Sequence, residues 1–479
     1  MRPVQAVTAG AARLGVDRGA GLLQGADVTL DGADAHLEAL GEPAGAAWPG
    51  CDRPQFLDKG VEPVGTVHAQ HARAGVRQSP GTAPAPRSHR RPPKVCSMTQ
   101  ESPEPRVSTL ELFFDLVFVF TVTQLADSLA HHPTWSGLVD VLLVLVVVWW
   151  MYSGYAWLTN AVAPTTTTRR TLLLAGMAGF LVMALAIPDA FGHNGWLFGV
   201  AYVVVNVTHS VLFLQAGPDA RRVMRTLGPM NLLAALLVLT GGVLPEPWRH
   251  LCWLAAPVVQ VLASYSHPIG LHHIAAGHFV ERHSLVMIIA IGESVIAIGV
   301  GVGGQGHLGG DLILAAVLGL AIAYYLWWTY FADGDRRSEH VLAAVDDPAR
   351  RGRLALNAWG YAHIPMLLGI VITAVGIKKT LGHTFEALHW PEALMLGGGV
   401  AVYLLGHAVF LRLLAQPGPG YRVIVATCCL ATVPLGHLLA VAQLAAVAVI
   451  LAAGAIAEDI PRVRRAGLQA AIGDFGRTG

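Results

Sequence analysis

Two acidic residues interrupt apolar segments that are long enough to cross a membrane, and they are the first candidates for chemistry. Asp115 lies near the start of one such segment, and Glu293 lies near the middle of another. An acid at the centre of a membrane helix costs about 2.5–3.5 kcal/mol on insertion scales, and it is a functional hypothesis by default. A buried carboxyl group without a cation beside it can bind and release a proton near neutral pH. The two acids therefore predict proton or cation coupling.

The surroundings of the first acid leave a structural interpretation open. Ser108 and Glu111 have the spacing of a capping box ahead of an apolar run, which gives Glu111 a role at a helix start. Asp115 follows Glu111 by one turn on the same face, and an ion pair with an arginine such as Arg106 would also explain it. Glu111 and Asp115 are therefore candidates for coupling or for structural pairing, with Arg106 as a supporting residue.

Polar residues in two other apolar segments extend the coupling hypothesis. Asn206 and His209 are three positions apart and share a face of a predicted helix, and His407 has a similar place in a later segment. Histidine is a common proton relay. We predict that these three residues relay protons or polarise the acids. The alternative is that they are hydrogen-bonded side chains of the core.

A histidine-rich stretch at 267–283 resembles a metal site only in composition. Its histidines are His267, His272, His273, His278 and His283. Steps of five residues do not share a helix face, and no set of cysteines or carboxylates completes a four-ligand zinc site. We therefore expect no metal and no other cofactor. The stretch is predicted to be a cytoplasmic loop that positions Glu281 and Arg282 at the entry of the next span.

The overall composition indicates an integral membrane protein. The chain has 479 residues, of which 54% are hydrophobic and only 13% are charged, and its mean hydropathy is +0.52. Soluble domains carry about 25% charged residues. The net charge of +1 gives no basic field for nucleic acid, which excludes a nucleic-acid partner. The five cysteines contain no CxxC pair, so we expect their thiols to be reduced and to form no metal site.

The apolar runs predict an all-α, polytopic protein with about 12 transmembrane helices. A spanning helix needs about 20 apolar residues. The first six expected spans are Leu110–Leu129, Gly137–Thr159, Thr171–Ala190, Gly195–Ala216, Leu227–Leu244 and Trp248–Tyr265. The second six are Ser284–Val302, Leu312–Phe331, Leu354–Val375, Ala393–Leu411, Tyr421–Gly436 and Leu438–Ala457. Only Pro434 and Gly436 divide the last two spans, which makes that division the weakest.

The distribution of basic residues predicts the orientation. With twelve spans and a cytoplasmic N-terminus, nearly all arginines after residue 98 fall on the cytoplasmic side. Only Arg249, Lys378 and Lys379 fall outside. The positive-inside rule therefore favours a bacterial cytoplasmic membrane protein with both termini in the cytoplasm. The lipid bilayer is its expected partner, and a homo-oligomer remains open.

Two internal matches predict that the twelve spans form two parallel six-helix repeats. Trp149-Trp150-Met151-Tyr152 recurs as Trp327-Trp328-Thr329-Tyr330, and the same offset carries Asp115 onto Glu293. The repeats are expected at residues 98–266 and 284–461, related by an axis along the membrane normal, as in some transporters. Anchoring at the membrane interface would also explain the aromatic pairs.

The two ends of the chain differ from this pattern. Residues 1–97 are rich in charge, proline and glycine and contain no long apolar run, so we expect a disordered extension or a translation start at Met98. Residues 462–479 are expected to be a basic cytoplasmic tail.

Two motifs resemble the signatures of a known family. Residues 108–119, STLELFFDLVFV, resemble the opening signature of the bacterial low temperature requirement A (LtrA) family. Residues 281–285, ERHSL, followed by IGES at 291–294, resemble its second signature. The resemblance covers roughly residues 100–460. It implies a polytopic cytoplasmic-membrane protein and a link to growth in the cold, but no particular biochemical activity.

Three classes of function follow from these observations. The first is a transporter or channel for an ion or small solute, in which Glu293 exchanges a proton or binds a cation and Asp115 is its counterpart. The second is a membrane-embedded enzyme that modifies lipids, for which no GxSxG or HExxH motif is present. The third is a structural or stress-response membrane protein whose acids lock helices together. We expect a transporter rather than an enzyme.

Overall fold

The computed structural model describes residues 107–266, 274–303, 307–332 and 334–475. All of these residues belong to the unit Val95–Gly479. All its described elements are helices, which confirms the all-α prediction. The expectations for residues 1–97 and for Arg106 fall outside the described residues.

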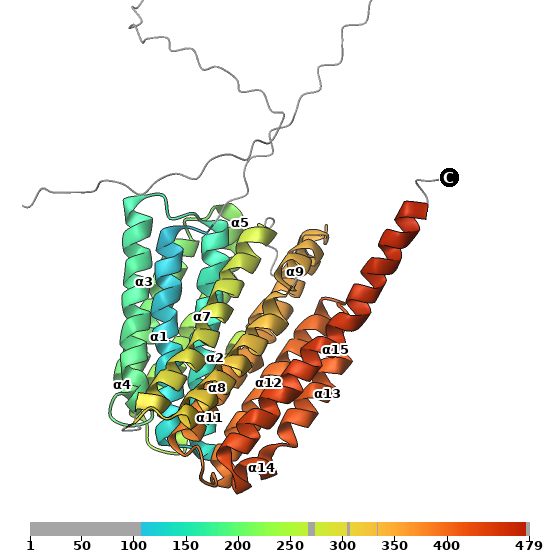
Figure 1. The fold of residues 1–479 in the computed structure, drawn as a ribbon. Helices are drawn as coiled ribbons and strands as arrows, with labels where there is room; N and C mark the ends of the chain where they lie inside the picture. Colours follow the sequence, from blue (N-terminus) through green and yellow to red (C-terminus); the bar gives the residue numbers. More distant parts are fainter. Residues whose placement is uncertain (1–106, 267–273, 304–306, 333, 476–479) are drawn as a thin grey trace, which may run out of the picture. The chain divides into compact units, whose positions relative to one another are not determined.

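The first half of the bundle contains six helices, each at the place of an expected span (Figure 1). They are α1 (Thr109–His131), α2 (Trp135–Ala161), α3 (Thr167–Ala186), α4 (Gly195–Phe213), α5 (Pro218–Val243) and α6 (Trp248–Ser266), with the 3-10 turn η1 (Ile187–Asp189) after α3. The expected capping box begins α1. The backbone N–H of Glu111 donates to Ser108 Oγ over 3.4 Å, and the Glu111 carboxylate accepts from the Ser108 N–H over 2.7 Å.

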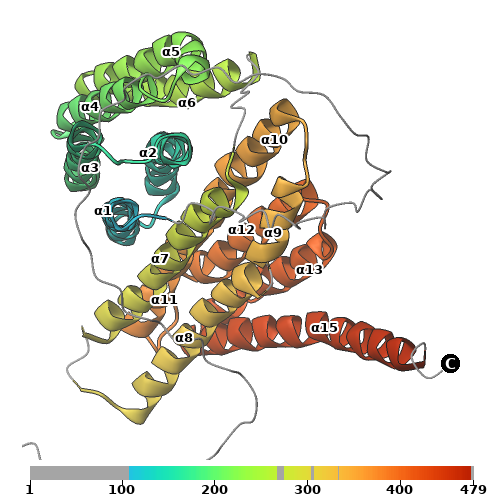
Figure 2. The same cartoon turned by 90° about the horizontal axis from the view of Figure 1, so that it is seen from above.

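The second half contains the remaining helices. They are α7 (Ala276–Gly303), α8 (Gly310–Phe331), α9 (Gly334–Ala343), α10 (Pro348–Ala355), the π-helix η2 (Leu356–Tyr361), α11 (His363–Gly382), α12 (Trp390–Leu413), α13 (Pro419–Leu430), α14 (Val433–Leu438) and α15 (Ala440–Phe475). Seen from above, α1–α6 group on one side, and α7 runs between them and the rest (Figure 2). In agreement with this view, α7 packs on α1, α2, α8 and α11.

Eleven helical segments in the described residues are long and apolar enough to cross a membrane. Each of the twelve expected spans coincides with a helix or a pair of helices. The eleventh expected span corresponds to α13 and α14 together. The expected span that is not among the eleven apolar segments is α6, because Arg249, His250 and Gln260 lower its mean hydropathy. The chain is therefore a multi-pass membrane protein with eleven to twelve spanning helices.

The neighbours of the helices follow the same order in the two halves. Within the first half α3 packs on α4, α4 on α5 and α5 on α6. Within the second half α11 packs on α12, α12 on α13 and α13 on α15. In addition α1 packs on α3, as α7 packs on α11. This order is consistent with duplication, but the two-repeat arrangement stays a prediction.

The entry into α7 differs from the expectation. The seventh span was expected to begin at Ser284, whereas α7 begins at Ala276. His278, Arg282 and His283 are therefore buried helix residues rather than loop residues. The loop prediction failed here because helix starts are poorly marked where polar residues form the first turns.

Packing also changes the interpretation of the aromatic motif on α2. Interface anchoring was one explanation for Trp149 and Tyr152, but both side chains are buried inside the bundle, as is Tyr155 one turn further on. Tyr324 on α8, by contrast, is exposed on the helix surface. The motif on α2 therefore contributes to the core.

Glycines permit a close approach of helices α11 and α12. Gly299 and Gly303 on α7 have the spacing of a small-xxx-small pair, but a side chain added at either would meet open space. On α11, a side chain added at Gly376 would collide with the backbone of Leu396 on α12. Gly301 instead faces α11, near Leu381. The tightest of these contacts is thus between α11 and α12.

We predict that Gly376→Ile destabilises the protein by about 1–3 kcal/mol or more, because the added side chain must push α11 and α12 apart. Gly299→Ile is the matched control and should leave stability nearly unchanged, since it points to open space. Thermal unfolding of both variants in detergent measures the difference. Equal melting temperatures would contradict the packing described here.

Candidate functional site

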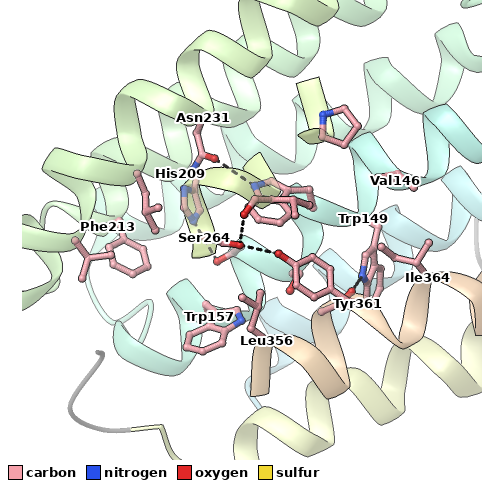
Figure 3. Close-up of a pocket in the computed structure, with 18 of the residues that line it drawn as sticks. Val146, Trp149, Trp157, His209, Phe213, Asn231, Ser264, Leu356, Tyr361 and Ile364 are labelled. Atoms are coloured by element: carbon pink, nitrogen blue, oxygen red, sulfur yellow. Dashed lines mark hydrogen bonds between the residues drawn. The ribbon is translucent and has the colours of Figure 1, made fainter. Parts of the chain in front are cut away.

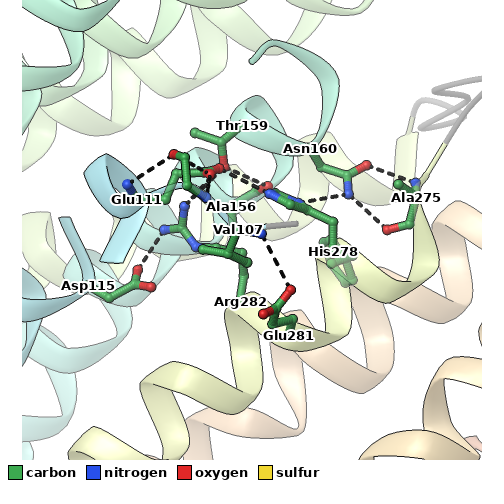
Figure 4. A network of polar contacts seen from close by, with 12 residues as sticks. Val107, Glu111, Asp115, Ala156, Thr159, Asn160, Ala275, His278, Glu281 and Arg282 are labelled. Atoms are coloured by element: carbon green, nitrogen blue, oxygen red, sulfur yellow. Dashed lines mark hydrogen bonds and ion pairs between the residues drawn. The ribbon is translucent and has the colours of Figure 1, made fainter. Parts of the chain in front are cut away.

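A buried arginine connects the helices at one end of the bundle. Arg282 on α7 is fully buried, and its guanidinium contacts Asp115 Oδ1 at 2.6 Å and Glu111 Oε1 at 3.3 Å, both on α1 (Figure 4). It also donates to Thr159 Oγ1 on α2 over 3.1 Å. The sequence places Glu111 and Asp115 one turn apart, so one guanidinium reaches both carboxylates. The three charges form a compact ion-pair cluster.

Further polar side chains complete this cluster. The Tyr152 hydroxyl on α2 donates to Asp115 Oδ1 over 2.8 Å, and His278 Nε2 lies 3.2 Å from Glu111 Oε1. Asn160 holds the start of α7: its amide donates to the Ala275 carbonyl over 3.0 Å and its side-chain oxygen accepts from the Ala275 N–H over 3.1 Å. The ends of α1, α2 and α7 are thereby held together.

The cluster supports the structural interpretation of Asp115 and Glu111. Both carboxylates have a cationic partner, so neither needs a transported cation to be stable. Among the described residues, the arginine that pairs with Asp115 is Arg282. Glu281 lies outside the cluster, where its exposed carboxylate accepts from the Val107 N–H at 3.4 Å.

Glu293 has a different environment. Its side chain is only 5% exposed, and Thr123 on α1 donates a hydrogen bond to Oε2 over 2.6 Å. The charged groups that act on it are Lys378 on α11 and Asp127 on α1, which pair with each other at 3.2 Å. Asp127 and Lys378 are partly exposed near the opposite end of the bundle from Arg282. Within the described part of the chain, Glu293 is therefore a buried acid with a hydroxyl partner and no direct ion pair.

The two acids do not occupy equivalent positions. Asp115 is level with Arg282, whereas Glu293 is level with Thr123, which lies eight residues further along α1. Eight residues correspond to about 12 Å along a helix. Buried Phe118 and Val122 occupy the stretch between them. The equivalence expected from the shared offset is therefore not supported by the contacts.

His209 lines an apolar cavity of about 120 Å³ between α2, α4, α5, α6 and η2 (Figure 3). Its Nε2 lies 3.1 Å from the Gly154 carbonyl, and its buried Nδ1 has no hydrogen-bond partner among the described residues. Asn206, three residues earlier, lines a separate recess between α4 and α5 and donates to the Tyr202 carbonyl over 2.8 Å. The two residues therefore face different spaces.

His407 lies in a third place. It borders a small polar cavity of about 30 Å³ at the ends of α8, α12 and α13, next to the Arg422–Glu458 ion pair of 2.8 Å. Its buried Nδ1 has no hydrogen-bond partner among the described residues. Neither His209 nor His407 contacts Glu293, so the predicted residues occupy several sites rather than one path.

Several residues of these sites were not predicted. His278 is one turn before Arg282, so their common face could have been recognised once the helix start was known. Thr123 is an ordinary residue of an apolar helix, and nothing in its spacing marks it. No group of three or more His, Cys, Asp or Glu side chains in the described part of the chain is arranged to hold a metal.

Comparison with known proteins identifies relatives of this chain. The model of the bacterial low temperature requirement A protein family matches residues 106–457. The chain is also similar to an uncharacterised protein of Rhizobium meliloti (strain 1021), with 28% identity over 320 residues, which cover 64% of this chain and 77% of that protein. The matched region includes the Arg282 cluster and Glu293.

We predict that Arg282→Met destabilises the protein by about 3–5 kcal/mol, because it leaves Glu111 and Asp115 buried without their cation. Arg282→Lys keeps one charge but loses the forked geometry, so it should fall between Arg282→Met and the wild type. Arg221→Met, at an exposed arginine, is the control. Wild-type thermal stability of Arg282→Met in detergent would refute the structural role.

Proposed function

The chain belongs to the bacterial low temperature requirement A family, and from this membership and the environment of Glu293 we propose that it is a transporter or channel of the bacterial cytoplasmic membrane. In this proposal Glu293 exchanges a proton or binds a cation, and Asp115 and Glu111 hold the cytoplasmic ends of α1, α2 and α7 together. The proposal assigns the chain no enzymatic activity.

The observation that carries this proposal is the contrast between the two kinds of buried acid. Asp115 meets a guanidinium at 2.6 Å, whereas Glu293 accepts a hydrogen bond from the neutral Thr123 hydroxyl, also at 2.6 Å. A hydroxyl offsets part of the cost of burying a carboxylate but supplies no charge. A proton or a cation from solution would supply the missing positive charge, and either can dissociate again.

The position of Glu293 supports access from one side of the membrane. Asp127 follows Thr123 by one turn on α1, and its carboxylate is about half exposed. In this proposal a proton or cation reaches Glu293 from the end of the bundle that carries the Asp127–Lys378 pair. On the other side, Phe118, Val122 and the Arg282 cluster separate Glu293 from the opposite end of the bundle.

The positions of the basic residues support the orientation in this proposal. Arginines gather at the starts of α3, α5 and α10, and Arg282 lies in the first turns of α7. Arg249 at the start of α6 and Lys378 and Lys379 at the end of α11 lie toward the opposite end of the bundle. By the positive-inside rule, the end that holds the Arg282 cluster faces the cytoplasm, and the Asp127–Lys378 pair faces outward.

A structural role is the second candidate, and the Arg282 cluster favours it for one end of the bundle. If Glu293 also served only to join helices, apolar replacement would be tolerated, because buried polar pairs often yield to apolar residues without loss of stability. A Glu293→Leu variant that complements a deletion strain as well as the wild-type protein does would favour this alternative over transport.

We predict that Glu293→Gln abolishes proton- or cation-coupled flux while the protein still folds, because glutamine keeps the shape and the contact with Thr123 but cannot ionise. The measurement uses proteoliposomes that contain a trapped pH-sensitive dye, with imposed K⁺ or Na⁺ gradients. Glu386→Gln, at an exposed acid, is the matched control and should retain wild-type flux. Wild-type flux in Glu293→Gln would reject the coupling role.

A second prediction concerns the hydroxyl partner. Thr123→Val removes the hydrogen bond to Glu293 and should change both the rate and the pH profile of flux. Thr123→Ser keeps the hydroxyl and should retain most of the wild-type behaviour. If the two variants behaved alike in the same proteoliposome assay, the Thr123 contact would have no part in coupling.

A further inference from the structure

We propose that the recess between α4 and α5 binds one anionic phospholipid, with its phosphate on Arg225 and an acyl chain along the apolar wall. The lipid comes from the leaflet that surrounds the start of α5. This proposal goes beyond the role of Glu293 and does not depend on it, because it concerns a lipid bound to the first half of the chain and not flux.

The recess exists because α4 and α5 are in close contact at one end and separate toward the other. A side chain added at Gly199 on α4 would collide with the backbone of Leu239 on α5, whereas one added at Gly228, near the start of α5, would meet no atom of α4. Pro229 lies inside α5 and has no N–H to bond the Arg225 carbonyl. The two helices lie side by side at the edge of the first half (Figure 2) and leave a recess of about 460 Å³.

The wall of the recess is apolar and open to the bilayer. Four of its aliphatic side chains are between 41% and 46% exposed, namely Val207, Val211, Leu214 and Leu232. The three on α4 extend over seven residues, or about 10 Å by helix rise. An acyl chain fills such a recess through van der Waals contacts. A water-soluble ligand would instead have to lose its hydration to enter the hydrocarbon layer.

The polar side chains of the wall are already used within α4. The Asn206 amide donates to the Tyr202 carbonyl over 2.8 Å, and Ser210 Oγ donates to the Asn206 carbonyl over 2.9 Å. Among the described residues that line the recess, Arg225 is the only one with a charge. The ligand is therefore apolar along most of its length and meets a cation at one point.

Arg225 selects an anion at the level of the lipid head groups. It lies two residues before the apolar run that begins at Leu227, and its side chain is exposed. Arg169 at the start of α3 donates to the carbonyls of Ala163 and Gln215 over 3.3 and 3.5 Å. Arg225, in contrast, makes no hydrogen bond or ion pair through its side chain within the described part of the chain. An unpaired guanidinium can bind a phosphate through two parallel N–H groups.

The charge and the volume of the recess favour a lipid with a net negative charge. A zwitterionic head group would bring its own cation close to Arg225, whereas an anionic one would not. Basic pockets between membrane helices are known to bind anionic head groups. The volume of about 460 Å³ lies within the range of ligand pockets, roughly 300–1,000 Å³. The recess therefore accommodates a phosphate and the upper part of one acyl chain.

The test titrates the full chain in detergent with phosphatidylglycerol or with phosphatidylcholine of the same acyl chains, and it measures bound lipid by native mass spectrometry. We expect the first phosphatidylglycerol to bind about fivefold more tightly, which is the contribution of one arginine at the membrane surface. Equal affinities would overturn the proposal. Glycerol phosphate has the charge without the acyl chains and should not displace the lipid. Displacement at equal concentration would show that the apolar wall has no part in binding.

Two pairs of variants locate the site. Arg225→Gln should weaken phosphatidylglycerol binding about fivefold and leave phosphatidylcholine binding unchanged. Arg412→Gln removes the same charge from an exposed arginine of α12 and should change neither. Val211→Trp fills the recess from α4 and should abolish the tight binding of phosphatidylglycerol. Val204→Trp, at an equally exposed position of α4 outside the recess, should retain it.

Each pair can also contradict the proposal. Unchanged phosphatidylglycerol binding in folded Arg225→Gln or Val211→Trp would show that the lipid binds elsewhere. Equal losses in Arg225→Gln and Arg412→Gln would show that net charge attracts the lipid and that Arg225 is no site. Melting temperatures of the lipid-free variants establish that they are folded. All four variants leave Glu293 intact, so failure of this proposal is separate from failure of the proposed transport function.

Discussion

The guanidinium of Arg282 is the charge on which one end of the bundle depends. It is buried at the meeting point of α1, α2 and α7, and it neutralises two carboxylates that would otherwise be costly in an apolar interior. Tyr152 and Thr159 bring α2 into the same cluster. Since α7 also packs on α8 and α11, the cluster connects the first half of the chain to the second.

This arrangement separates two kinds of intramembrane acid that look alike in sequence. Asp115 is part of a satisfied ion-pair cluster, whereas Glu293 depends on a threonine hydroxyl and lies some 12 Å further along α1 by helix rise. Burial alone therefore does not indicate transport. The kind of partner decides whether a carboxylate is part of the framework or is available to a proton or cation.

The structure also divides the predicted polar residues among separate spaces. Asn206 and His209 are neighbours on α4, yet one faces the recess toward α5 and the other faces the apolar cavity. His407 borders a polar cavity beside the Arg422–Glu458 pair. A coupling path through all of them is not supported by these positions. The Glu293 site and the apolar cavity are distinct, and each has its own chemistry.

The sequence by itself determined the membrane class, the all-helical fold, the places of the spans and the capping box at Ser108, because hydropathy and capping act over one helix at a time. It also singled out Glu111 and Asp115 as acids of interest and placed Arg282 at the entry of a span. Only the tertiary structure decided that these three pair with one another. They lie as much as 171 positions apart along the chain, and a pairing between helices depends on how α1 and α7 pack. For the same reason no local pattern could show that Thr123 meets Glu293, or that the Trp149 motif lies in the core instead of at the membrane interface.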